Sequence, residues 1–202
     1  MSSKDKMVDS QIKRVFKKAS PIEEEVYIEL EKWRALFFKM GLFSKSQSDL
    51  VSYSQLSKRL SGAEHFIITG ENTQKSAHLS GQQYAKVTKL DEQRKLIEAQ
   101  GTIPPPPQAW WHGKLFLRLD RASALFQIDN ESLVKRLAGQ NSLRLEAKDL
   151  KSAGLEELKK EAAKNNAGIF LFEAEKTCAF VWGSSVEAAG KLALEELKLA
   201  RK

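Results

Sequence analysis

The sequence predicts an α/β domain of three layers (α/β/α), in which a central mixed and largely antiparallel sheet lies between two layers of helices. Three observations predict this class. Predicted helices alternate with predicted strands along the chain, as they do in layered α/β folds. Two pairs of strand-like segments are separated by short turns, which is typical of antiparallel hairpins. The 202 residues, 42% of them hydrophobic, suffice for one buried core.

Residues 1–19 form a basic leader ahead of the predicted domain, which spans residues 20–202. Four cations lie in the second half of this leader: Lys13, Arg14, Lys17 and Lys18. Val8, Ile12 and Phe16 are spaced as on one face of a helix. The leader is therefore expected to form a short amphipathic helix or to remain a frayed tail.

A first helix is predicted between Ser20 and Gly41. Ser20 can cap its start, Pro21 suits its first turn, and Glu23 completes a capping box. Gly41 is a typical residue for the end of a helix. One buried face follows from apolar residues at helical spacing, namely Val26, Leu30, Trp33, Phe37 and Met40.

The middle of the chain predicts strands. Phe66–Thr69 is apolar and stops at Gly70, so it is expected to be a buried strand. Residues 84–88 and 94–99 flank a turn at residues 91–92, which predicts a hairpin. Residues 51–60 are mixed and polar and predict no element.

The second half of the chain alternates helices and strands. The four prolines at 104–107 predict a stiff loop, with a polyproline ligand for a partner as the alternative. A helix is expected from Ala109, and a last helix is expected after a capping box of Ser184 and Glu187. Between them the pattern predicts a strand at 124–126, a helix at 131–138, a strand at 143–146, a helix at 155–164, and an antiparallel pair at 168–173 and 178–183.

Charge and composition favour a cytoplasmic protein without a membrane span. The formal net charge is +7, but the cations are interleaved with glutamates, which favours an ordinary charged surface over a nucleic-acid-binding face. No apolar run approaches the ~18 residues of a membrane helix. A single cysteine, Cys178, cannot form an internal disulfide, so a reducing compartment is expected.

Four segments, in their order and spacing, resemble the class II aldolase/adducin family over roughly residues 25–200. They are YSQLSKRL at 53–60, HFIITG at 65–70 with YAKV at 84–87, PPPQAWWHGKLF at 105–116, and the ending from AGIFLF through FVWGSSVEAAGKLALEEL. The resemblance implies a class II aldolase-like fold. It also implies a homo-oligomer such as a tetramer, because the family's site lies between subunits.

Family members of known activity bind a divalent metal, usually zinc, through three histidines, and a glutamate handles protons. The resemblance places the histidines at Gln127, Asp129 and Thr177, and the glutamate at Gln108. An amide, a carboxylate and a hydroxyl make a poor zinc site, and an amide cannot accept a proton as a carboxylate does. The resemblance therefore implies that the zinc and the aldol chemistry are lost.

The family's loops that hold an anionic substrate are altered as well. Its Gly-Asn pair falls on Ser54 and Gln55, and its Ser-Ser pair falls on Pro106 and Pro107, which offer neither a hydroxyl nor an N–H. Family-like chemistry remains at Ser57, Arg59, Thr69, Gly70 and His112.

Two functions follow from these substitutions. The first is a pseudoenzyme that acts as a binding or scaffolding module, as adducin head domains do, with the leader as a contact arm. The second is a divergent lyase or epimerase-like enzyme, with altered or no metal, that holds a small anionic sugar or acid at Ser57 and Arg59 and uses His112. A polyanion-binding protein is a third and weaker interpretation of the net charge.

Each candidate residue also has a structural interpretation. His112 can bond a loop carbonyl, Arg59 can form a surface ion pair, and Cys178 can serve as a small buried apolar residue. A hard-cation site is the functional alternative for a group of three carboxylates, which more often cap helices or face water: Asp129, Glu131 and Glu173.

Overall fold

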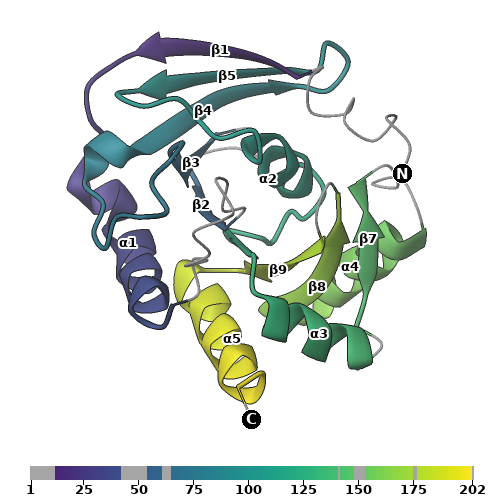
Figure 1. Cartoon of the computed structure of the whole chain (residues 1–202). Coiled ribbons are helices and arrows are strands. Elements are labelled where there is room, and N and C mark those ends of the chain that lie inside the picture. The colour runs from purple at the N-terminus through teal and green to yellow at the C-terminus, as the bar shows by residue number, and fades with distance from the viewer. Residues whose placement is uncertain are drawn as a thin grey trace, which may run out of the picture.

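A computed structural model of the chain describes residues 12–41, 54–60, 65–140, 142–147, 153–174 and 177–201. Their centre is a mixed sheet with the strand order β1-β5-β4-β3-β2-β6-β9-β8-β7 (Figure 1). The β1–β5 and β7–β8 pairs are parallel, and the other pairs are antiparallel. The strands are β1 (Lys13–Lys18), β2 (Gln55–Arg59), β3 (Phe66–Thr69), β4 (Tyr84–Asp91), β5 (Leu96–Gly101), β6 (Ala124–Ile128), β7 (Arg144–Glu146), β8 (Ala167–Glu173) and β9 (Thr177–Gly183).

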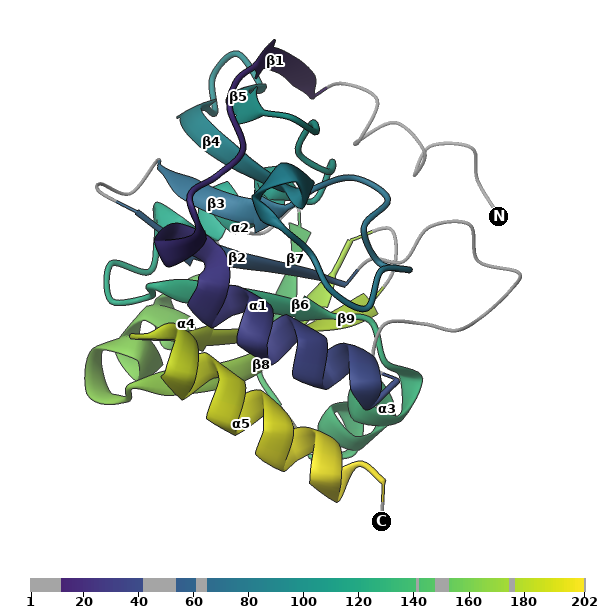
Figure 2. The same cartoon turned by 90° about the vertical axis from the view of Figure 1, so that its left-hand side faces the viewer.

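Helices cover both faces of this sheet. One face packs against α1 (Glu24–Lys39), α3 (Glu131–Gly139) and α5 (Val186–Leu199), and Figure 2 looks on to α1 and α5 as they run side by side. The other face packs against α2 (Ala109–Phe116) and α4 (Ala153–Lys164). A 3-10 turn, η3 (Gly81–Gln83), precedes β4. The three-layer fold with a mixed, largely antiparallel sheet is therefore confirmed.

Two apolar clusters hold the layers together, one on each face of the sheet. The cluster under α2 and α4 is rich in aromatic side chains that are almost fully buried: Phe170, Phe172, Phe180 and Trp182. Each such side chain contributes about 1.5–3 kcal/mol by leaving water. Strand alternation sends Cys178 to this same side, where it is buried as the apolar interpretation predicts.

The predicted buried strand at Phe66–Thr69 and both predicted hairpins are confirmed. The leader differs from the prediction, because residues 13–18 form β1 and pair in parallel with β5. Phe16 lies opposite Ala99 and packs partly buried against the cluster under α2. The helical spacing was misleading because a short isolated helix is unstable in water, whereas β1 pairs along the edge of β5 and packs Phe16 against the core. Val8 lies outside the described residues.

Both predicted capping boxes are wrong, with the N-cap displaced from Ser20 to Glu23 at α1 and from Ser184 to Ser185 at α5. Helix α1 begins at Glu24, and its N-cap Glu23 makes no side-chain capping bond. The segment before it is held extended, because Ile22 N donates to Gly81 O at 3.1 Å. At α5 the cap is Ser185, whose hydroxyl accepts from Ala188 N at 3.0 Å.

Strand β2 lies in the middle of the sheet, in a segment for which the sequence predicted no element. It pairs antiparallel with both β3 and β6. Its first three residues are buried, although two of them are polar. Residues 51–53 lie outside the described part of the chain. Polar side chains at the centre of a sheet need partners, and those partners define the candidate site.

Candidate functional site

Three polar side chains meet between the sheet and α2, and we call them the α2 polar cluster: Ser57, His112 and Gln127. Ser57 lies opposite Leu125 on β6, and Gln127 lies opposite Phe180 on β9. Because Leu125 and Phe180 belong to the core under α2, strand alternation turns the polar side chains to the same side. Helix α2 supplies the imidazole from above. All three residues are almost completely buried.

His112 is the chemical centre of this cluster. Its Nδ1 lies 2.6 Å from Ser57 Oγ, and its ring packs against Phe180 with centroids 5.1 Å apart. Burial lowers the pKa of His112 to about 3, and the nearby Gln127 amide opposes this shift. The imidazole is therefore neutral at pH 7.

Two polar atoms of the cluster have no hydrogen-bond partner of ordinary geometry in the described part of the chain: His112 Nε2 and Gln127 Oε1. If the Ser57 hydroxyl donates to Nδ1, the ring proton sits on Nε2, the nitrogen that Gln127 can approach. Such an arrangement can hold a proton in place. All three side chains are almost completely out of contact with solvent.

His112 predicts a pH dependence of stability. Its pKa is about 3 in the folded chain and about 6.5 when unfolded. Between these values the unfolded chain binds more protons, so the free energy of unfolding falls by up to about 1.4 kcal/mol per pH unit as the pH drops. Urea unfolding of wild type and His112→Asn at about pH 6.5 and about pH 5 measures this slope. We expect the free energy of unfolding to decrease by about 1.6 kcal/mol less in the variant than in the wild type. Equal decreases would contradict the burial of a neutral imidazole.

The three positions that the resemblance assigns to metal ligands do not converge. Gln127 points to the α2 side. Asp129 is buried just beyond β6, and its backbone N donates to Ser54 Oγ at 2.9 Å. Thr177 pairs with Glu173 in register, and alternation from Cys178 directs its side chain to the α1, α3 and α5 side. These residues do not fit a zinc ion, because their donors are not imidazoles and do not share one face.

Two of the three carboxylates in the hard-cation hypothesis have cationic partners. Glu131 Oε1 pairs with Lys135 Nζ at 2.6 Å, and Glu173 Oε1 pairs with Arg144 Nη1 at 3.3 Å. In the part of the chain that the structure describes, no group of three or more His, Cys, Asp or Glu side chains could hold a metal ion.

Arg59 is neither a free anion ligand nor a surface ion pair. Its guanidinium donates to the backbone carbonyls of Phe116, Leu119 and Ala122, each at 2.7 Å, and lies over the Phe116 ring at 4.9 Å. These carbonyls lie at and just after the C-terminal end of α2, where cations are favourable. Burial lowers the pKa of Arg59. Since Ser57 is bonded to His112, the predicted anion-holding pair is engaged inside the protein.

Thr69 and Gly70 close the neighbouring strand ends rather than open a loop for a ligand. Thr69 Oγ1 donates to Gln55 Oε1 and accepts from Leu56 N at 3.3 Å. A Cβ on Gly70 would lie 2.4 Å from Ile103 Cγ2, so the glycine allows this side chain to pack closely. Gln108, to which the resemblance assigns the position of the family's glutamate, is buried at the start of α2.

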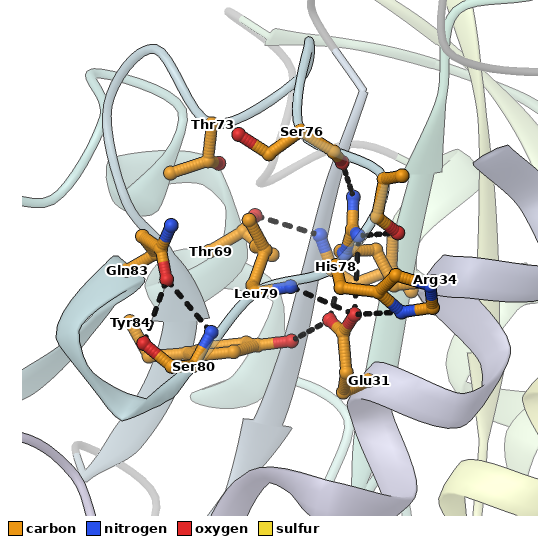
Figure 3. Close-up of polar contacts among 12 residues, drawn as sticks. Glu31, Arg34, Thr69, Thr73, Ser76, His78, Leu79, Ser80, Gln83 and Tyr84 are labelled. Carbon is orange, nitrogen blue, oxygen red and sulfur yellow. Dashed lines mark hydrogen bonds and ion pairs between the residues drawn. The ribbon is translucent and has the colours of Figure 1, made fainter.

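A second buried network was missed by the sequence analysis, and we call it the Glu31–Arg34 clamp (Figure 3). The Glu31 carboxylate accepts from Arg34 at 2.7 and 3.1 Å, from Tyr84 Oη at 2.8 Å and from Leu79 N at 2.9 Å. Arg34 also donates to Ser76 O and Ala77 O, at 2.9 and 2.6 Å. The clamp ties the segment between β3 and η3 to α1. Burial, with Glu31 nearby, raises the pKa of Tyr84.

One signal could have revealed the clamp. Leu30, Arg34 and Phe37 recur at the i, i+4, i+7 spacing of a buried helical face. An arginine within such a stripe predicts a buried cation, and Glu31 supplies the charge that a buried cation needs.

The arrangement of strands and helices matches solved structures of known proteins. L-fuculose-1-phosphate aldolase from Thermus thermophilus superposes with a TM-score of 0.57 at 21% identity, covering 89% of this chain and 93% of that one. YgbL from Escherichia coli superposes with a TM-score of 0.62 at 18% identity, covering 88% of this chain and 87% of that one. An aldolase II superfamily protein from Pseudomonas syringae superposes with a TM-score of 0.54 at 17% identity, covering 90% of this chain and 74% of that one. The chain has the class II aldolase fold. No protein-family model and no curated protein sequence matches it.

This class II aldolase fold carries no membrane-spanning helix in its described part. None of the described helices is both long enough and apolar enough to cross a bilayer.

Proposed function

We propose that this chain is a non-catalytic protein with the class II aldolase fold that serves as a binding or scaffolding module. The observation that carries the proposal is Gln127, which stands where the resemblance places a zinc-binding histidine. An amide carbonyl is a weak zinc ligand. The neighbouring imidazole of His112 is already bonded to Ser57 and buried. The zinc of the family is therefore absent in this proposal.

A second support for the proposal is that neither candidate residue can act as the general base of an aldolase. Gln108 carries an amide, which does not take up a proton at neutral pH. His112 is the other candidate, but its pKa of about 3 makes it a weak base. Neither side chain supports proton abstraction from a substrate near pH 7.

The alternative function is a divergent lyase or epimerase-like enzyme that acts on a small anionic sugar or acid with altered or no metal. Its support is weaker, because its two anion donors have internal partners. Arg59 binds three carbonyls at the end of α2, and Ser57 binds His112. An anionic substrate would have to displace these bonds before it could bind.

A metal and activity measurement tests the proposal. The purified chain is dialysed against zinc, analysed for bound metal, and assayed for cleavage of L-fuculose 1-phosphate, with the Thermus thermophilus aldolase as the positive control. We expect substoichiometric zinc and no cleavage above background. Stoichiometric zinc that is lost in a Gln127→Ala variant, or metal-dependent cleavage by the wild type, would overturn the proposal.

We further propose that the chain assembles as a homo-oligomer, with a tetramer as the expected state, and that it resides in the cytoplasm. The support for the assembly is the fold, since the resemblance implies a site between subunits. Size-exclusion chromatography with light scattering measures the mass of the assembly. A monomer at all concentrations would contradict this part of the proposal.

A further inference from the structure

Strand β1 is an open edge of the sheet. It stands at one end of the strand order, and no described residue pairs with its outer side. Lys13 N donates to Lys95 O and Ala19 N donates to Gly101 O, both at 2.8 Å. In a parallel ladder the residues that bond one neighbour alternate with those that point away. The N–H and C=O groups of Arg14, Phe16 and Lys18 therefore point outward, where they form a template for another strand.

In the part of the chain that the structure describes, the surface around this edge is basic and exposed. All residues of β1 are exposed except Phe16, and Val15 is 44% exposed. The apolar cluster under α1, α3 and α5 contains no residue of β1 or β5, and Figure 1 shows both strands beyond these helices. The face that carries Val15 is therefore open to solvent at this end of the sheet.

The charges of β1 are mostly unneutralised. Lys13, Lys17 and Lys18 form no ion pair within the described residues. Arg14 differs, because it pairs with Glu71 and donates to Pro105 O at 3.0 Å, which fixes the strand against the loop before α2. Phe16 fixes it to the core. The strand is thus held firmly while three ammonium groups remain available.

We propose that β1 binds an acidic extended segment of a partner protein by adding a strand to the sheet. Edge pairing would satisfy the outward backbone groups, and carboxylates on one face of the added strand would lie beside Lys13 and Lys17. Lys18, on the face of Phe16, would add to the attraction for an acidic strand. A second copy of this strand is disfavoured, because an identical basic strand would bring like charges together. An apolar residue of the partner would pack beside Phe16. This inference rests on the proposed binding role, but it uses no residue of the α2 polar cluster.

Amide exchange of the full-length chain tests the pairing. The probe is a synthetic peptide of alternating Glu and Val residues, and the control peptide has the same sequence with N-methylated backbone amides. We expect the first peptide to slow exchange at the amides of Arg14, Phe16 and Lys18, while Val15 and Lys17, which already bond β5, change little. No slowing at the three outward amides, or equal slowing with the methylated peptide, would overturn the proposal.

Charge reversal supplies the matched variants. The triple variant Lys13→Glu, Lys17→Glu, Lys18→Glu is expected to weaken peptide binding at least about tenfold, which corresponds to about 1.4 kcal/mol. A variant of equal net charge, Lys32→Glu, Lys164→Glu, Lys198→Glu, changes exposed lysines on α1, α4 and α5 and is expected to bind like wild type. Equal losses in both variants would contradict a site on β1.

A single-stranded oligonucleotide of the same charge distinguishes strand addition from general attraction to polyanions. Phosphates attract lysines but do not pair with the outward amides in a ladder. Tighter binding of the oligonucleotide than of the peptide, without slowed exchange at the three amides, would assign β1 to nucleic acid and overturn the proposal. These results leave the zinc and cleavage measurements unaffected, so each proposal fails separately.

Discussion

Replacement of Arg34 by methionine is expected to destabilise the chain by about 3–5 kcal/mol, because it leaves the buried Glu31 carboxylate without its cation. The carboxylate would keep hydrogen bonds from Tyr84 Oη and Leu79 N, and His78 Nδ1 lies 3.9 Å from it. The carbonyls of Ser76 and Ala77 would also lose their donor. Urea unfolding at about pH 7, followed by circular dichroism, measures the loss.

A double-mutant cycle separates the ion pair from simple packing. Glu31→Met alone leaves the arginine unpaired and is expected to cost a similar amount, whereas the double variant removes both charges and should cost much less than the sum. Lys32→Met is the matched control, because Lys32 is exposed on the same helix, and its effect should stay within about 0.5 kcal/mol. A loss under about 1 kcal/mol for Arg34→Met, or strict additivity in the cycle, would contradict the clamp.

Apolar runs made most of the sheet predictable from the sequence, whereas the polar strand β2 was not predicted. Strand β3 is four apolar residues that stop at a glycine, so its pattern is local. Strand β2 reads QLSKR, and its polar side chains are stable in the core only because their partners come from elsewhere in the chain. Ser57 bonds His112, 55 positions away, and Arg59 bonds Leu119, 60 positions away. A short stretch of sequence around β2 contains none of these partners, so it could not indicate that the polar strand is buried.

The contacts of the candidate residues were not predictable from the sequence. Ser57, His112 and Gln127 come from three separate segments, and the structure brings their side chains together between the sheet and α2. The orientation of Thr177 was not predicted, because a shift of one residue along a strand moves a side chain to the opposite face. The clamp was missed because charged residues were assigned to the surface, whereas Glu31 and Arg34 are buried as a pair.

The class II aldolase fold and the positions that differ from the family's pattern lie in different parts of the molecule. The fold depends on the two apolar clusters and on backbone pairing between strands. The differing positions lie near strand and helix ends, where Thr69 at the end of β3 donates to Gln55 at the start of β2. In the proposed function these ends serve the core, and the further proposal places the partner at the edge of β1 instead.

Substitution of Gly81 by alanine is the second change expected to have a large effect, with a loss of about 3 kcal/mol, at the upper end of what overpacking costs. An added Cβ would lie 1.9 Å from the carbonyl oxygen of Ile22, which is backbone and is fixed by the hydrogen bond from Ile22 N to Gly81 O. The backbone of Gly81 does not have a positive φ, so the effect reports crowding alone.

Gly139→Ala is the matched control at the end of α3, where nothing described lies within 4 Å of an added Cβ. Alanine there should stabilise the chain by about 0.4–1 kcal/mol. Thermal and urea unfolding of both variants decide the prediction, and a Gly81→Ala chain as stable as wild type would show that the segment before α1 is not held against η3.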